Sequence, residues 1–141
     1  MRICFLGVEN MTAEDLADIQ AALYERINQR ILNSGAFRPV SKRYVDAGLK
    51  AAKLRPVDVL YPQNMRILAD HMEQIWQPFE FVLIAKLTSS PTRSNANNET
   101  EYLLTLEMVN LHNDQYAKES TTIVKTHAST WAKLNSLTPW G

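Results

Sequence analysis

The spacing of apolar residues changes once along this chain, and that change limits the folds available to it. Up to about Ile75 the apolar residues recur every three or four positions, which is the period of an amphipathic helix. From Phe79 onward they recur at every second position, which is the period of a strand with one buried face. Helices therefore gather in the first half and strands in the second, which predicts an α/β chain of the α+β type.

The longest helical pattern follows a short apolar strand that is predicted over residues 2–8. Thr12 is expected to be the N-cap of this helix, with Asp15 completing a capping box three residues later. Gly35 is expected to end the helix in the left-handed conformation. One apolar stripe joins these ends and consists of Leu16, Ile19, Leu23, Ile27 and Ile31.

A short extended piece and two further helices are predicted next. Pro39 holds Arg38 out of the helical region and lacks a backbone donor, so this strand should be brief and lie at a sheet edge. Ser41 caps a second helix, which Gly48 weakens by about 1 kcal/mol relative to alanine. Pro62 suits the first turn of a third helix. The expected inward residues are Val45, Leu49 and Ala52 in the second helix and Met65, Leu68, Met72 and Ile75 in the third, with Trp76 also in the core.

Three antiparallel strands are predicted for the second half. The strand over residues 79–87 places Phe79, Phe81, Leu83, Ala85 and Leu87 on one face, with Val82 and Ile84 partly covered on the other. A polar loop over residues 88–101 leads to the next strand, and a turn at residues 112–115 leads to the last. The predicted order is β-α-β-α-α-β-β-β, a mixed sheet whose C-terminal antiparallel meander packs against helices. We expect a single domain over residues 1–141, with a loosely held tail from about residue 135.

Charge and composition narrow the class of protein. Fifteen basic and fifteen acidic side chains cancel, so the net charge indicates neither nucleic acid nor an anionic membrane as a partner. The single cysteine, Cys4, has no internal disulfide partner and is expected to be a buried, inert thiol. The opening "MRICFLGVEN" is too short for a signal peptide, and no apolar stretch approaches the ~20 residues of a membrane span. Two alternatives stay open: a cytoplasmic protein that starts at Met1, or a domain whose natural leader was removed.

Catalytic and metal-binding motifs are absent from the sequence. His71, His112 and His127 lack the spacing of paired metal ligands and are expected to be surface or structural residues. Four glycines in total cannot form a glycine-rich phosphate loop. The sequence therefore predicts a protein that is not an enzyme and that carries no cofactor.

One segment departs from the neutral background. Six cations lie between Arg38 and Arg55 against the single acid Asp46, and six minus one gives a local charge of +5. Two interpretations stay open: a solvated helix face above its apolar stripe, or a docking patch for an acidic protein surface or for phosphate. Trp131, near the tail, is a candidate interface anchor. The candidate partner-binding residues are therefore Arg38, Lys42, Arg43, Lys50, Lys53 and Trp131.

Several stretches together resemble one known family. They are "ILNSGAFRPVSKRYVDAGL" from Ile31, "MRILADHMEQIW" from Met65, "FEFVLIAKLTS" from Phe79 and "LEMVNLHNDQYAKESTTIVK" from Leu106. In this order they resemble the globular domain of LpoB-type outer-membrane lipoproteins, which are related in fold to CsgG-type and TolB N-terminal domains. The resemblance covers nearly the whole chain in pattern.

The resemblance implies a non-catalytic periplasmic domain, tethered to the outer membrane in its natural precursor by a lipid anchor that this chain lacks. Its implied partner is the regulatory domain of a bifunctional penicillin-binding protein, which it would activate in peptidoglycan synthesis. The alternative is a CsgG-like component of an envelope assembly or secretion complex. We expect a monomer or a weak oligomer, and no nucleic acid partner.

Overall fold

The computed structural model describes residues 1–90, 100–125 and 131–132. It confirms the predicted α+β class and element order, and adds a one-turn 3-10 helix and a short last strand. The elements are β1 (Arg2–Asn10), α1 (Ala17–Ser34), β2 (Arg38–Pro39), α2 (Lys42–Ala52), η1 (Pro56–Asp58), α3 (Pro62–Gln74), β3 (Phe81–Ser89), β4 (Thr100–Asn110), β5 (Tyr116–Lys125) and β6 (Trp131–Ala132). The tail predicted from about residue 135 lies outside the described residues.

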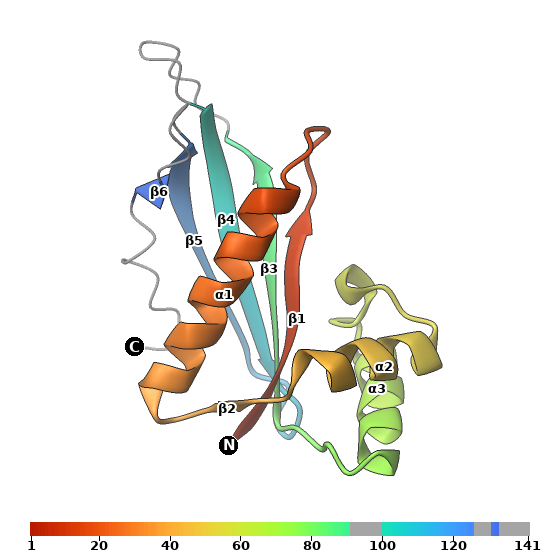
Figure 1. The fold of residues 1–141 in the computed structure, drawn as a ribbon. Helices are drawn as coiled ribbons and strands as arrows, with labels where there is room; N and C mark the ends of the chain where they lie inside the picture. The colour runs from red at the N-terminus through yellow and green to blue at the C-terminus, as the bar shows by residue number, and fades with distance from the viewer. Residues whose placement is uncertain (91–99, 126–130, 133–141) are drawn as a thin grey trace.

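The strands form one mixed sheet in the order β2-β1-β3-β4-β5-β6 (Figure 1). β1 is parallel to β2 and to β3, whereas β3, β4 and β5 pair antiparallel as the predicted meander. The added strand β6 pairs antiparallel with β5. β2 pairs only with Arg2 and Ile3 of β1. The brief edge strand predicted from Pro39 is therefore confirmed, and among the described residues most of β1 has no strand partner on the β2 side.

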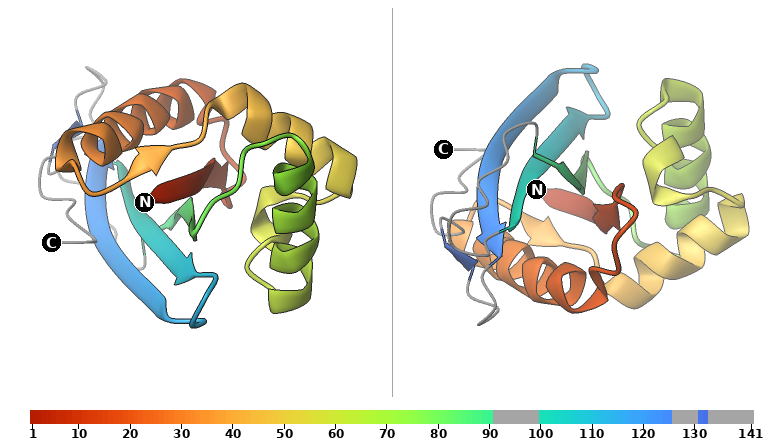
Figure 2. Two further views of the ribbon diagram at one scale, coloured as in Figure 1. Left: turned by 90° about the horizontal axis from the view of Figure 1, so that it is seen from below. Right: turned by 90° about the horizontal axis from the view of Figure 1, so that it is seen from above.

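Helices cover both faces of the sheet (Figure 2). α1 packs its apolar stripe on one face, against a cluster that includes Ile3 and Phe5 of β1 and Leu83 of β3. α2 and α3 pack on the other face, where Val82 and Ile84 are fully buried. The sheet centre is thus covered on both sides, more completely than the alternating pattern of β3 alone predicted.

The prediction for the start of α1 was wrong. The helix begins at Ala17, and Thr12 instead lies in a turn, where its N–H and hydroxyl donate to Asn10 Oδ1 at 2.9 and 2.6 Å. Asp15 Oδ1 accepts from the N–H of Ala17 at 3.1 Å. Thr12 Oγ1 accepts the N–H of Glu14 at 3.2 Å within this turn, five residues before the helix begins, so the capping box does not form. The C-terminal prediction is confirmed, because Gly35 follows the helix with φ 70°.

The α2–α3 pair is held together more closely than the sequence indicated. Gly48 is buried, and a Cβ built on it would collide with Met72 Sδ and lie 3.3 Å from Leu68 Cδ1. The glycine therefore brings the two helices into contact, in addition to weakening α2. Ser41 and Pro62 stand at the predicted helix starts, although the Ser41 side chain makes no capping hydrogen bond.

Two apolar residues near the end of α3 are not where the sequence predicted them. Ile75 lies just past the helix and is 38% exposed. Phe79 precedes β3, which begins at Phe81, and packs with the α2–α3 cluster instead of sharing a face with Leu83. Residues 77–80 lie outside any strand, with a bend at Glu80, so the alternation of β3 does not extend back to Phe79.

β1 contains a bulge that the apolar pattern did not reveal. Its register with β3 shifts between Phe5 and Val8, and Gly7 there has φ 103°. This φ favours glycine, since other residues meet a steric penalty in that region. Because of the bulge, Phe5 and Val8 both face α1 although they are three residues apart.

Candidate functional site

The predicted basic residues lie on the exposed side of α2 and at its ends. Lys42, Arg43 and Lys50 are exposed residues of α2, and Lys53 follows the helix in a left-handed conformation with φ 57°. We call these four residues the α2 surface. Arg38 is also exposed but lies on β2, opposite Arg2 in the register. Trp131 lies in β6, and its side chain is outside the described part of the structure.

Half of the α2 surface is engaged in local contacts. Lys42 Nζ lies 2.7 Å from Asp46 Oδ2 in an exposed ion pair one turn along the helix. The Arg43 guanidinium stands 4.7 Å from the ring centroid of Tyr44, and donates to its hydroxyl at 2.7 Å. Among the described residues, Lys50 and Lys53 form no ion pair. These two ammonium groups are therefore the part of the surface most open to an acidic partner.

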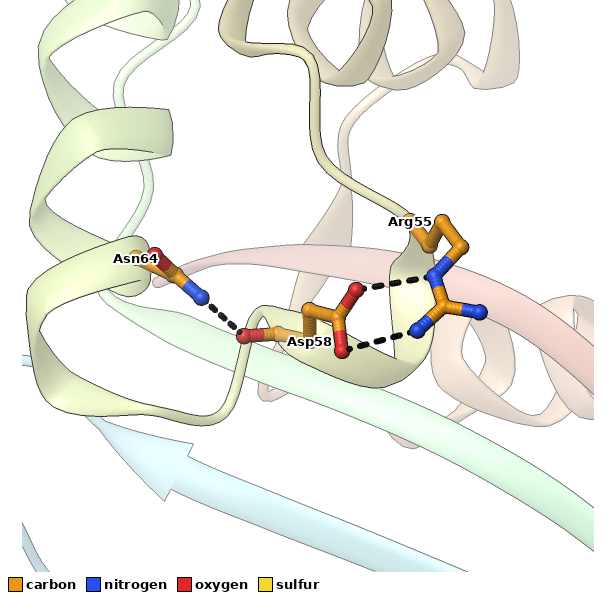
Figure 3. A network of polar contacts seen from close by, with 3 residues as sticks. All are labelled: Arg55, Asp58 and Asn64. Atoms are coloured by element: carbon orange, nitrogen blue, oxygen red, sulfur yellow. Dashed lines mark hydrogen bonds and ion pairs between the residues drawn. The ribbon is translucent and has the colours of Figure 1, made fainter.

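Arg55, the last cation of the basic segment, has a structural partner. Its guanidinium donates from Nε to one carboxylate oxygen of Asp58 at 2.9 Å and from a terminal nitrogen to the other at 3.4 Å (Figure 3). Asn64 of α3 donates to the backbone carbonyl of Asp58 at 2.9 Å. The hydrogen bond and the charge of Asp58 raise the pKa of Arg55. This network closes the connection between α2 and α3, and it places Arg55 in a structural role.

A cleft of about 460 Å³ opens between α1 and α2 at the free edge of β1. Its floor is the β1 segment that includes the bulge, and its walls come from the two helices and from Pro56. Lys42 is the only predicted site residue in it. The lining residues are Leu6, Gly7, Val8, Glu9, Gln20, Ala21, Tyr24, Glu25, Lys42, Asp46, Leu49 and Pro56.

The free edge of β1 is held in the cleft by a side chain. Gln20 Nε2 donates to the backbone carbonyl of Val8 at 2.8 Å, where a neighbouring strand would otherwise donate an N–H. Tyr24, one turn further along α1, stacks on Phe5 with ring centroids 5.0 Å apart and planes at 11°. The walls of the cleft are therefore fixed by contacts with the sheet beneath them.

The charge of the cleft differs from that of the α2 surface beside it. Three carboxylates, Glu9, Glu25 and Asp46, line the cleft against the single cation Lys42, and three minus one leaves a net charge of −2. Burial raises the pKa of Tyr24, and the negative charges of Asp46 and Glu25 add to this effect. Its phenol thus stays protonated and neutral. Sequence inspection missed this cleft, although Gly7 within an apolar strand is a recognised signal of a bulge.

A second polar cluster spans β3, β4 and β5. Glu107 receives Lys86 Nζ at 2.9 Å on one carboxylate oxygen and the Tyr116 hydroxyl at 2.7 Å on the other. Burial opposes ionisation of Glu107, but the hydrogen bonds from Lys86 and Tyr116 and the nearby lysine charges outweigh it, so the pKa of Glu107 is lowered. The groups that lower this pKa lie on the neighbouring strands β3 and β5, and cross-strand contacts of this kind mark the cluster as structural.

The remaining groups with reactive side chains are the cysteine and the histidines. Cys4 is fully buried, which confirms the predicted burial, and burial raises the pKa of its thiol to about 12. His71 is half-buried and His112 is exposed, while His127 lies outside the described residues. Within residues 1–90, 100–125 and 131–132, no three metal-ligating side chains gather closely enough to hold an ion.

Trp76 is the largest departure from the sequence prediction. It was expected in the core, yet its side chain is 86% exposed. Its φ of 62° places it in the left-handed position that follows α3. There its N–H donates to the Glu73 carbonyl at 3.0 Å, and the N–H of Gln77 donates to the Met72 carbonyl at 2.8 Å. This is a Schellman motif with tryptophan at the position where glycine is usual.

Comparison with known proteins shows structural similarity but no sequence match. No protein-family model matches the chain, and no curated protein sequence matches it. A lipoprotein from Neisseria meningitidis is similar in structure with a TM-score of 0.61 at 11% identity, over 96% of this chain and 90% of that one. A hypothetical protein from Chlamydia trachomatis has a TM-score of 0.55 at 18% identity, over 95% of this chain and 77% of that one. The chain therefore shares its fold with a bacterial lipoprotein.

In the described part of the chain, no helix is both long enough and apolar enough to cross a bilayer.

Proposed function

We propose that this domain is a non-catalytic protein-binding domain of the bacterial envelope, and specifically an LpoB-type activator of a bifunctional penicillin-binding protein. The fold shared with a neisserial lipoprotein supports placement in the envelope. The resemblance of residues 31–49, 65–76, 79–89 and 106–125 to the LpoB-type domain supplies the partner.

The observation that carries this proposal is the exposure of Lys50 and Lys53 on a rigid support. Both ammonium groups lack an ion-pair partner among the described residues, and α2 is fixed against α3 at Gly48. A cationic surface on a fixed helix suits an acidic protein surface, because it attracts the partner without first having to be ordered. Docking then favours the active conformation of the synthase over the inactive one, which is activation by a population shift.

The test is a titration of the purified domain against the bifunctional penicillin-binding protein of its source organism, with the rate of glycan synthesis as the second readout. Lys50→Glu should weaken binding about fivefold, equivalent to ~1 kcal/mol, and the loss should shrink at high salt. Arg66→Glu, an exposed reversal of the same charge on α3, is the matched control.

The possible outcomes test the proposed surface and the proposed partner separately. Equal affinities for Lys50→Glu and Arg66→Glu would remove the α2 surface from the interface. Absence of binding by the unchanged domain would refute the proposed partner. Thermal melting of both variants checks folding, because a glutamate in the last turn of α2 opposes the helix dipole by about 0.3–1 kcal/mol.

The exposed Trp76 favours a second candidate, an envelope assembly component that contacts copies of itself. A large aromatic side chain in water, held by the Schellman motif, is typical of an interface anchor. Light scattering over a range of concentrations tests this function. A mass that rises with concentration and returns to the monomer in Trp76→Ala would support it, whereas a monomer at every concentration would exclude it.

A further inference from the structure

The α1–α2 cleft combines a free strand edge with a cavity of suitable size. β2 leaves β1 after Ile3, and the four residues Leu6, Gly7, Val8 and Glu9 line the cleft. At about 3.3 Å per residue, they offer roughly 13 Å of strand edge. The volume of about 460 Å³ also falls within the range of ligand-binding pockets. An extended peptide matches both dimensions.

The side chain of Gln20 occupies the free edge of β1 with a hydrogen bond that an incoming strand can replace. Its side-chain amide holds the Val8 carbonyl at 2.8 Å, so this carbonyl is satisfied while the cleft is empty. An incoming strand would replace one hydrogen bond from a side chain by one from its own backbone, so the carbonyl is not left unpaired at any stage. The Gly7 backbone approaches the same cleft, and apart from the two flanking residues no described atom lies within 4 Å of where its Cβ would stand. The backbone at the bulge is therefore open to a ligand.

Charge selects the kind of peptide. Asp46 is paired with Lys42, which leaves Glu9 and Glu25 without an ion pair among the described residues. Arg55 interacts with the charge of Glu9, but its guanidinium is bonded to both oxygens of Asp58. A positively charged side chain complements the two open carboxylates, and the ring of Tyr24 offers apolar surface to its stem.

We propose that the α1–α2 cleft binds an extended polypeptide segment of a partner protein, which lies along the free edge of β1 and places a lysine or arginine between Glu9 and Glu25. The inference rests on the cleft, which shares only Lys42 with the α2 surface, and it is independent of a penicillin-binding protein as partner. It assigns the domain a second binding site, of opposite charge to the first.

The test follows the NMR signals of the domain during titration with a short capped peptide of alternating valine and lysine. The backbone amides of residues 6–9 and the side-chain amide of Gln20 should shift, since the peptide displaces that amide from Val8. The same peptide with glutamate in place of lysine should not bind. Glu25→Gln should weaken the lysine peptide about threefold, as expected for one exposed charge pair, and Glu73→Gln on α3 should leave it unchanged.

A matched pair of variants tests the position. Ala21 and Ala22 are both exposed residues of α1, but only Ala21 lines the cleft. Ala21→Trp should fill the cleft and abolish binding, whereas Ala22→Trp should bind normally. Equal binding by the two tryptophan variants, or equal binding of the lysine and glutamate peptides, overturns the proposal. Shifts of the same signals with protein concentration alone, without peptide, would assign the cleft to a second copy and also overturn it.

Discussion

Replacing Trp76 by glycine should stabilise this protein, although it removes the largest side chain near the end of α3. Trp76 has φ 62°, and a residue with a Cβ loses about 1–2 kcal/mol in the left-handed region. Little burial is lost in return, because the indole is 86% exposed. Glycine also lowers the free energy of unfolding by about 0.5–1 kcal/mol, because its unfolded chain has more conformational freedom to lose on folding. The net expectation is a gain of about 1 kcal/mol in the free energy of unfolding.

Chemical and thermal unfolding of Trp76→Gly and Trp76→Ala measure this effect directly. The alanine variant keeps the strained backbone and should match the unchanged protein, while the glycine variant should melt about 3 °C higher. The difference between the two variants isolates the backbone from the loss of the indole. If Trp76→Gly is no more stable than Trp76→Ala, the left-handed conformation is not the source of a stability cost at this position, and the argument fails.

Three further predictions concern Gly48, Cys4 and Glu107. Gly48→Ala should destabilise the fold by up to about 2 kcal/mol in urea unfolding, because overpacking against Met72 exceeds the helix gain; a stabilised variant would contradict this. Cys4 should react with a thiol reagent only after unfolding, since burial raises its pKa to about 12; rapid labelling of the native protein would be the contrary result. The lowered pKa of Glu107 contributes stability above the unfolded-state pKa of about 4.3, and this contribution is lost as pH falls through the folded-state pKa. Tyr116→Phe should therefore cost about 1 kcal/mol at neutral pH and progressively less below about pH 4, and an equal cost at both pH values would refute the role of the hydrogen bond.

The sequence predicted the elements whose limits are set by neighbouring residues. The stripe from Leu16 to Ile31 is buried as its spacing predicted, and Gly35 ends α1. Pro39 confines β2 to two residues at the sheet edge, and Pro62 begins α3. In each case the cause is a local backbone preference or a local period, and neither requires a partner from elsewhere in the chain.

Predictions failed where a nearby side chain or turn competed with the pattern on which they rested. Thr12 has the chemistry of an N-cap, but Asn10 engages it and the helix begins at Ala17. Trp76 has the composition of a core residue, yet the turn after α3 directs it into water. The cations of the basic segment are exposed, as expected for a solvated helix face. The pairing of Arg55 with Asp58, however, was not predicted.

The sequence by itself thus determined the α+β class, the order of the elements, the burial of the cysteine and the exposed cations of α2. Only the tertiary structure decided that β1 has a free edge, that Gly48 is a helix contact and that carboxylates from three elements meet in one cleft. The physical reason is the range of the interactions. Backbone preferences and apolar periods act between neighbours in the chain, whereas an edge, a close helix contact or a cleft exists only once segments far apart in the sequence have packed together.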